Sequence, residues 1–231
     1  MRLRRVVLTG AAGLIGRSVG PLLPRDWQTI RTDLEVADGV AQLDVTDVDA
    51  CRRAFEGADA VVHLAAVPDP DASWEQLLQP NVHGTVVVAE AVMACAVPRL
   101  VLASSLQAVS APPPTVQRRA GDPPRPANLY GATKAFAEAV GSWVAATSAT
   151  SVVALRIGYF APDRPGDGAG VRERSAWLSV RDAAELLRAA VEADVTGLVV
   201  VNGISANRHR GADVDETIAV LGYRPSDDAW H

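Results

Sequence analysis

The sequence contains only two cysteines, Cys51 and Cys95, in 231 residues. Two thiols cannot form a disulfide framework, and the lack of a Cys-x-x-Cys pair argues against a zinc or dithiol redox site, so no metal ion is expected. No stretch reaches the roughly 18 apolar residues that a membrane-spanning helix requires. Gly10 and Gly13 interrupt the apolar N-terminal segment, which is not typical of a secretory signal. These absences favour a reducing, cytoplasmic setting.

Aromatic residues make up only 5% of the chain, and positive charge is not in excess: 22 Lys and Arg residues oppose 27 Asp and Glu residues. A net negative chain argues against nucleic acid or an anionic membrane as a partner. The hydrophobic fraction of 48% and the charged fraction of 21% exclude wholesale disorder. We therefore expect one domain over 1–231, with a mainly aliphatic core.

Short apolar, β-branched runs alternate with longer stretches of helical periodicity. We expect strands at 5–9, 28–32, 60–65, 100–103, 152–157 and 198–201, and helices near 14–23, 46–56, 74–95, 129–148, 181–193 and 213–221. This alternation predicts an α/β fold, a doubly wound parallel sheet (Rossmann fold) with a small C-terminal substrate-binding portion. Ligands of such sheets bind at the carboxyl ends of the strands. Two stretches rich in proline, glycine and charge, 110–127 and 161–174, are expected to be loops.

A glycine-rich turn follows the first expected strand. Its sequence is T-G-A-A-G-L-I-G, with Gly10, Gly13 and Gly16 spaced three apart around Leu14 and Ile15. Glycines in a strand-to-helix turn permit the tight turn, the close approach of a pyrophosphate and close packing of the helix. We therefore predict that this loop binds a dinucleotide.

Two aspartates are candidate contacts for the adenosine end of that dinucleotide. Asp33 ends the second expected strand, where a carboxylate accepts hydrogen bonds from ribose hydroxyls and repels a 2′-phosphate, which favours NAD over NADP. An ordinary turn aspartate is the alternative. Arg31 could assist a 2′-phosphate, but strand alternation turns it away. Asp44 is a candidate for the adenine edge, or else an N-cap or turn residue.

Tyr130 and Lys134 lie in the segment Y-G-A-T-K, one helical turn apart on one face of the expected helix. A nearby ammonium favours the phenolate, so we expect the pKa of Tyr130 to fall and the phenol to act as a general base. Ser105 ends the preceding strand and could hold the reacting oxygen beside Tyr130. Asn81, in P-N-V-H-G-T, could bind backbone or direct a water to Lys134, or simply end a helix. His63, at a strand end, is expected to be a packed structural histidine.

Together, these elements resemble the extended short-chain dehydrogenase/reductase superfamily, in its NAD-dependent epimerase/dehydratase branch. The segments RPANLYGATKAFAE, LRIGYFAP, RSAWLSVRDAAELLRA, ISAN and LGYRPSDDA are most similar to the uronate dehydrogenase group. The resemblance implies NAD as cofactor and Ser105, Tyr130 and Lys134 as the catalytic triad. It implies an NAD-binding core over 1–160, with the small substrate-side segment 161–231 interleaved with it. It also implies that Arg172 holds a substrate carboxylate.

The resemblance extends to further contact positions. Those for the cofactor are Gly10, Gly13, Leu14, Ile15, Gly16, Asp33, Asp44, Val45, Leu64, Ala65, Ala66, Asn81, Tyr130, Lys134 and Ile157; those for the substrate are Arg172, Ser105, Leu106, Gln107 and Tyr159. Several positions depart from the family pattern. Leu14 replaces a glutamine, Leu106 and Gln107 replace an Asn-His pair, and the Pro68 region and Tyr159 replace serines. Because these relatives use such groups to bind sugar hydroxyls, we expect a more apolar pocket and a less hydroxylated substrate.

The expected function is an NAD-dependent oxidoreductase that oxidises a hydroxyl or hemiacetal carbon, or reduces the carbonyl, of a small, sugar-like substrate that can carry a carboxylate. An epimerase with tightly bound cofactor and a non-catalytic dinucleotide-sensing protein are the alternatives. Leu106 and Gln107 stand where sugar-nucleotide dehydratases carry an acidic pair, which argues against dehydration. The helix over 131–147 has a wide apolar arc including Phe136 and Trp143, so we expect a homodimer.

Overall fold

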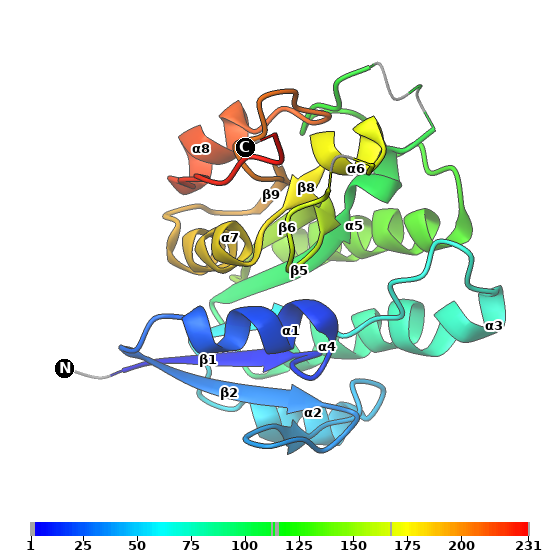
Figure 1. Cartoon of the computed structure of the whole chain (residues 1–231). Coiled ribbons are helices and arrows are strands. Elements are labelled where there is room, and N and C mark those ends of the chain that lie inside the picture. Colours follow the sequence, from blue (N-terminus) through cyan, green and yellow to red (C-terminus); the bar gives the residue numbers. More distant parts are fainter. Residues whose placement is uncertain (1–2, 112, 114–115, 167, 231) are drawn as a thin grey trace.

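The computed structural model describes residues 3–111, 113, 116–166 and 168–230. Within this part of the chain, seven parallel strands form one sheet in the order β3-β2-β1-β4-β5-β6-β9 (Figure 1). The strands are β1 Arg4–Thr9, β2 Trp27–Asp33, β3 Ala41–Gln42, β4 Ala60–His63, β5 Arg99–Ser105, β6 Ser151–Ile157 and β9 Leu198–Gly203. The order reverses between β1 and β4, which is the point at which a doubly wound sheet opens a ligand crevice.

Helices cover both faces of the sheet (Figure 1). They are α1 Leu14–Val19, α2 Val48–Phe55, α4 Gly84–Ala94, α5 Leu129–Thr147, α7 Val180–Glu192 and α8 Asp215–Leu221. Successive β1 side chains alternate between faces, so Val6 and Leu8 pack with α1, α7 and α8, whereas Val7 packs with α2, α4 and α5. Two aliphatic cores result. The predicted α/β, doubly wound parallel fold is confirmed, and each of the six expected strands is present.

The sequence pattern misses three very short strands. These are β3, β7 (Tyr159–Phe160) and β8 (Trp177–Leu178), each of two residues. Two residues carry no measurable alternation, so periodicity cannot detect them. The expected strand ends were also too late for β4, which stops at His63, and too early for β5, which reaches Ser105.

The helix expected near 74–95 is present, but it is not α-helical throughout. The structure has α3 (Trp74–Leu77), a π-helical turn (Leu78–His83) and then α4. Pro80 lies in the turn and has no N–H to donate, and a proline ring clashes with the carbonyl four residues earlier. A wider turn relieves both problems, and such turns are frequent at functional sites.

The loop expected over 161–174 is wrong at its end, because α6 (Val171–Ser175) begins there. The Glu173 carboxylate caps the helix by accepting a hydrogen bond from the Gly170 N–H at 3.3 Å. The described residues of 110–127 form no helix or strand, apart from an isolated bridge between Arg118 and Ala212. Among the helices of the described residues, none is both long and apolar enough to cross a lipid bilayer.

Candidate active site

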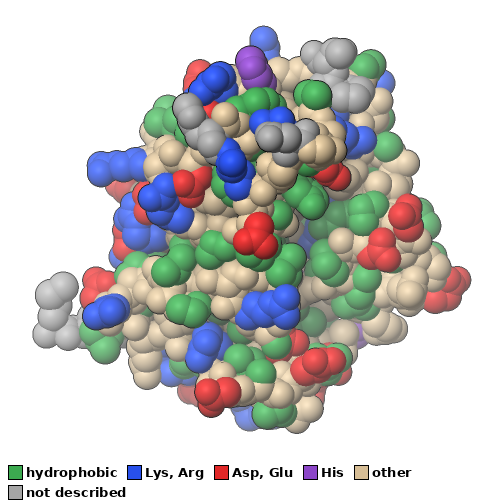
Figure 2. Space-filling view, in the orientation of Figure 1, with side chains coloured by type: hydrophobic (Ala, Val, Ile, Leu, Met, Phe, Trp, Pro, Cys, Tyr) green, Lys and Arg blue, Asp and Glu red, His purple; other side chains and the backbone are tan. Residues whose placement is uncertain are grey.

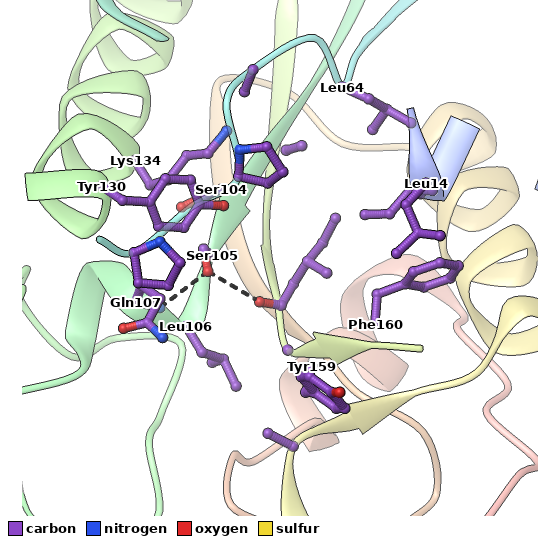
Figure 3. Close-up of a pocket in the computed structure, with 18 of the residues that line it drawn as sticks. Leu14, Leu64, Ser104, Ser105, Leu106, Gln107, Tyr130, Lys134, Tyr159 and Phe160 are labelled. Carbon is purple, nitrogen blue, oxygen red and sulfur yellow. Dashed lines mark hydrogen bonds between the residues drawn. The ribbon is translucent and has the colours of Figure 1, made fainter. Parts of the chain in front are cut away.

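A cavity of about 630 Å³ opens at the carboxyl ends of the central strands (Figure 3). The predicted site residues in its wall are Gly10, Gly13, Leu14, Ile15, Gly16, Leu64, Ala66, Ser105, Leu106, Gln107, Tyr130, Lys134, Ile157, Tyr159 and Arg172. Five other predicted residues, Asp33, Asp44, Val45, Ala65 and Asn81, lie outside this wall. The fold thus brings the glycine loop, the tyrosine-lysine helix and the strand-end serine to one cavity.

The glycine loop requires the absence of side chains. Gly10 has a φ of +72°, and a Cβ there would lie 2.5 Å from the Ala65 nitrogen. A Cβ on Gly16 would lie 2.4 Å from the Gly10 carbonyl oxygen. No side chain caps the start of α1 at Gly13, so backbone forms this part of the cavity wall. These residues fit a dinucleotide, whose pyrophosphate needs close contact with backbone N–H groups.

Asp33 lies at the end of β2 beside the glycine loop. Its carboxylate accepts a hydrogen bond from the Ala12 N–H at 2.8 Å. Asp44 forms a turn, accepting hydrogen bonds from the Thr46 backbone N–H at 2.8 Å and the Thr46 hydroxyl at 2.7 Å. Val45 is buried in the core, where its side chain packs against the backbone of Gly84. Of these three side chains, the one hydrogen-bonded to the glycine loop is Asp33.

The start of α5 is pressed against the end of β5. Asn128 caps the helix, its side-chain oxygen accepting a hydrogen bond from the Gly131 N–H at 2.7 Å, and its amide donates to the Gln107 side chain at 3.3 Å. A Cβ on Gly131 would lie 2.3 Å from the Gln107 carbonyl oxygen. The glycine of the Y-G-A-T-K segment therefore permits the close approach that sets Tyr130 beside Ser105 (Figure 3).

Tyr130 and Lys134 are both buried, and the Lys134 amine lies 5.6 Å from the centroid of the Tyr130 ring. Burial raises the pKa of Tyr130 to about 12, against a smaller lowering by the Ser105 hydroxyl. Burial also lowers the pKa of Lys134 to about 8. The expected fall of the Tyr130 pKa is therefore wrong for the chain by itself. The physical reason is desolvation, which disfavours the charged forms of both groups and exceeds their mutual attraction.

Asn81 binds the backbone of the loop after β4 and a side chain of α5, although it does not itself line the cavity. Its side chain accepts a hydrogen bond from the Val67 N–H at 2.8 Å and donates to the Val67 carbonyl at 3.1 Å and the Thr133 hydroxyl at 3.2 Å. Thr133 in turn donates to the Tyr130 carbonyl at 2.8 Å. The π-helical turn thus ties the loop after β4 to the helix turn that carries Tyr130 and Lys134.

His63 is a packed residue, as expected. It is buried, its Nδ1 lies 2.8 Å from the Thr9 hydroxyl, and burial together with the charge of Lys134 lowers its pKa to about 3. A neutral imidazole therefore stabilises the strand ends below the site. Among the described residues, no group of three or more His, Cys, Asp or Glu side chains is placed to hold a metal ion.

Sequence reasoning missed several residues of the cavity wall, of which Arg118, Phe160 and Pro70 change its chemistry most. Arg118 comes from the proline-rich segment, where no local pattern distinguishes one arginine from its neighbours. Phe160 lies in the two-residue strand β7. Leu14 and Leu64 lie on the same side of the cavity as Phe160, opposite Tyr130 (Figure 3), so this side of the wall is apolar.

Comparison with known proteins identifies the family of the chain. Residues 6–168 match the NAD dependent epimerase/dehydratase family. The chain is 38% identical to L-arabinose 1-dehydrogenase (NAD(P)(+)) of Haloferax volcanii over 97% of both chains. It is 34% identical to the NAD-dependent glucose-6-phosphate dehydrogenase of the same organism, over 97% of this chain and 94% of that protein.

A solved structure shows the same architecture with a cofactor bound. It is a variant of uronate dehydrogenase from Agrobacterium tumefaciens in complex with NAD, at a TM-score of 0.89 and 30% identity, covering 99% of this chain and 87% of that one. The family match spans most of the chain, and its relatives match over nearly their full length. The chain belongs to the NAD-dependent epimerase/dehydratase family, within the extended short-chain dehydrogenases, and is an NAD-dependent oxidoreductase.

Proposed function

We propose that the enzyme oxidises the hydroxyl-bearing or hemiacetal carbon of a small, sugar-like molecule. The observation that carries this proposal is the convergence of Ser105, Tyr130 and Lys134 with the glycine loop on one cavity. The relatives support it, because their names give L-arabinose, glucose 6-phosphate and uronate as substrates. A volume of about 630 Å³ suits a small substrate beside the nicotinamide end of the cofactor.

Each side chain has a distinct role in this proposal. NAD supplies a positively charged nicotinamide ring that accepts a hydride. Tyr130 removes the hydroxyl proton, and Ser105 binds the same oxygen, because its hydroxyl lies beside the phenol (Figure 3). Lys134, when protonated, stabilises the phenolate. Since burial opposes ionisation of both groups, the positive charge of the cofactor is needed to bring Tyr130 into its working range.

The substrate is expected to carry fewer hydroxyl groups than a hexuronic acid. Pro68, Pro70, Leu106 and Phe160 all line the cavity and offer no side-chain hydrogen bond. A polyol in such a pocket would lose its hydrogen bonds to water without replacement, which costs several orders of magnitude in specificity. Arg172, which is exposed at the cavity wall, is the side chain that we assign to a substrate anion.

The test is a panel of aldoses, deoxy-aldoses, sugar acids and simple alcohols with NAD, following the absorbance of NADH. Turnover of deoxy-aldoses and other sparsely hydroxylated sugar-like members, with lower rates for fully hydroxylated aldoses and for simple alcohols, is the expected result. If the enzyme binds NAD but reduces none of it with any panel member, the proposal is wrong. Stoichiometric NAD in the purified protein, with conversion between epimers and no net NADH, would favour an epimerase instead.

Asp33→Asn is expected to reduce the preference for NAD over NADP by at least about tenfold, because it removes a charge that repels the 2′-phosphate. The amide oxygen can still accept the Ala12 N–H, so the loop geometry is retained. The measurement is the ratio of kcat/KM for the two cofactors. Asp44→Asn is the matched control and should leave the ratio unchanged. An unaltered ratio in Asp33→Asn would contradict the ribose assignment.

Lys134→Met is expected to inactivate the enzyme and to stabilise it by about 3 kcal/mol at pH 7. The pKa of Lys134 is about 8 in the fold against an ordinary value of 10.5, so the unfolded state binds the proton more strongly. Below pH 8 wild type bears the full cost of the buried charge, which also faces His63. This cost to the folded state falls as the pH rises from 8, where the buried amine loses its proton, and it is gone above 10.5, where the amine of the unfolded chain is also neutral.

Urea unfolding of both proteins without NAD, at pH 7 and pH 10, measures this difference. The advantage of the methionine variant should shrink at the higher pH. Lys134 is the only lysine in the chain, so no other lysine side chain titrates in that window. A variant less stable than wild type at pH 7 would show that the burial of this amine is not costly.

We further propose a homodimer that pairs through α5. Trp143 and Ala139 on this helix are exposed in the isolated chain, and Phe136 is only half-buried. A large apolar side chain on an exposed helix face favours association with a second copy.

Light scattering should give twice the chain mass. Trp143→Glu should give a monomer, whereas Ser142→Glu, one residue earlier on the same helix, should remain dimeric; a monomeric wild type at micromolar concentration would reject the proposal.

The proposed location of the enzyme is the cytoplasm. Cys51 and Cys95 are both free thiols, and Cys51 is buried in the core. Thiols persist in a reducing compartment. This is the same compartment in which pyridine nucleotides support soluble dehydrogenases.

A further inference from the structure

The substrate end of the cavity contains a second arginine that the family resemblance does not assign. Arg118 and Arg172 both line the cavity, although they lie in different segments of the chain. Arg118 is 6% exposed, whereas Arg172 is exposed on α6. The two guanidinium groups are close enough for the charge of Arg172 to contribute to the lowered pKa of Arg118, after burial.

A chain of hydrogen bonds connects the backbones of the two arginines. The Arg118 N–H donates to the Gly211 carbonyl at 3.1 Å, and the Gly211 N–H donates to the Ser175 carbonyl at 2.9 Å. The Ser175 hydroxyl donates to the Arg172 carbonyl at 3.1 Å. Three segments that are distant in sequence thus meet at one end of the cavity.

Arg118 is held further by its own carbonyl. This oxygen accepts hydrogen bonds from the Asp213 N–H at 2.8 Å and from the Asn202 side-chain amide at 3.2 Å. Asn202 belongs to β9 and is completely buried. The backbone of Arg118 is therefore anchored to the sheet, although the residue lies in a long proline-rich segment. This anchoring requires no bound ligand.

The charge of this cavity differs from that of the whole protein. Among the described residues of its wall, Arg118, Lys134 and Arg172 are cationic and Glu173 is the one carboxylate. The complete chain has a net charge of -5. Figure 2 shows Lys and Arg side chains beside Asp and Glu side chains over much of this face, with hydrophobic side chains around a central hollow. Lys134 has a role beside Tyr130, so the two arginines leave an excess of positive charge at the substrate end.

Two arginines close together repel each other unless an anion lies between them. One guanidinium fork satisfies a carboxylate, whereas a phosphate monoester carries nearly two charges and three acceptor oxygens. Asp122 also contributes a charge near Arg118, but it is outside the cavity wall. We infer that Arg118 and Arg172 form a subsite for a phosphate group, and that the substrate is a small phosphate monoester with its reacting carbon at Tyr130. This inference rests on the proposed function.

The binding test uses inorganic phosphate as the probe, titrated calorimetrically into NAD-loaded protein at constant ionic strength. Bound NAD keeps the probe away from the glycine loop. Arg118→Gln should weaken phosphate binding by at least about tenfold, since it removes charge-assisted hydrogen bonds. The matched control, Arg119→Gln, removes the same charge from an exposed neighbour outside the cavity wall and should change binding by less than about twofold. Acetate, the carboxylate probe, should be affected much less by Arg118→Gln.

Three results would overturn the inference. They are phosphate binding that Arg118→Gln leaves unchanged, equal losses in Arg118→Gln and Arg119→Gln, and acetate binding as tight as that of phosphate. The last would indicate a carboxylate site that needs only Arg172. If Arg118→Gln does not fold, Arg118→Lys keeps the charge but loses the planar fork, and a partial loss of phosphate affinity is expected.

The activity test separates this inference from the proposed function. The value of kcat/KM is compared for aldoses and their phosphate monoesters, and wild type should prefer the phosphorylated member by at least about tenfold. Turnover of neutral aldoses with no preference for phosphate would overturn the phosphate subsite and leave the proposed function intact. Phosphate binding that depends on Arg118, with no turnover of any sugar, would support the phosphate subsite and overturn the proposed function.

Discussion

Tyr130→Phe is expected to lower kcat by roughly 10²–10⁴-fold while leaving the affinity for NAD within about twofold, because it deletes only the proposed proton acceptor. The phenyl ring still fills the buried position between α5 and the end of β5, so the fold and the cofactor site are retained. The measurement is steady-state NADH formation on the best panel substrate, together with calorimetric titration of NAD.

Tyr159→Phe is the matched control for this change. Tyr159 lines the same cavity but is 45% exposed, and its hydroxyl is not assigned to the reaction. Its loss should change kcat by less than about tenfold and act mainly on KM. If Tyr130→Phe retains most of the wild-type kcat, the phenol is not the base, and the mechanism proposed for the site is wrong.

The pH dependence of the reaction follows from the same geometry. Burial holds the pKa of Tyr130 at about 12 in the chain alone, which is too high for a base at neutral pH. The charge of the nicotinamide and that of Lys134 both favour the phenolate. The kcat profile should therefore rise through an apparent pKa well below 12. Because Tyr130 and Lys134 interact, that pKa belongs to the pair.

Local patterns in the sequence predicted the parts of the site that are built locally. Gly10, Gly13 and Gly16 lie in one turn, and Tyr130 and Lys134 lie one turn apart on one helix, so their spacing already encodes their relative positions. The parallel sheet then brings strand ends together, which places Ser105 opposite the glycine loop. The fold class was predictable for the same reason, because apolar strands and helices alternate along the whole chain.

Contacts between distant segments were not predictable. Arg118 is held at the cavity by contacts with residues 202–213, which are distant in sequence, and the proline-rich segment around it has no periodicity that could reveal them. The direction of the Tyr130 pKa shift was also missed, since burial by the rest of the fold decides it. The break at Pro80 was visible as a residue, but the compensating π-helical turn was not.

A buried ion pair connects segments that are distant in sequence, and its removal is expected to have a large effect on stability. Glu138 on α5 and Arg156 on β6 are almost fully buried, and their charged groups meet at 2.8 and 2.9 Å. Ser104, the neighbour of Ser105, donates a hydrogen bond to Glu138 at 2.6 Å. Arg156 also donates to the Ala120 and Asp122 carbonyls at 3.1 Å each. The pair therefore links α5, which carries Tyr130, to β5, which ends at Ser105, and to the segment that carries Arg118.

Glu138→Ala is expected to destabilise the fold by about 3–5 kcal/mol, because it leaves a guanidinium buried without a counter-charge. Urea unfolding without NAD measures the loss. The matched control is Glu185→Ala, which breaks the more exposed ion pair with Arg188 and should cost at most about 1 kcal/mol. The double change Glu138→Leu with Arg156→Met should recover most of the stability, since it removes both buried charges.

The double variant also separates stability from positioning. Its apolar side chains can fill the core. They cannot accept the hydrogen bond from the Ser104 hydroxyl, and they cannot donate hydrogen bonds to the Ala120 and Asp122 carbonyls. We therefore expect a stable protein whose kcat falls at least about tenfold, as misplacement of catalytic groups is costly even at small distances. A double variant with wild-type kcat would show that the pair maintains the fold and nothing more. A Glu138→Ala variant no less stable than Glu185→Ala would show that Arg156 finds another counter-charge within the fold.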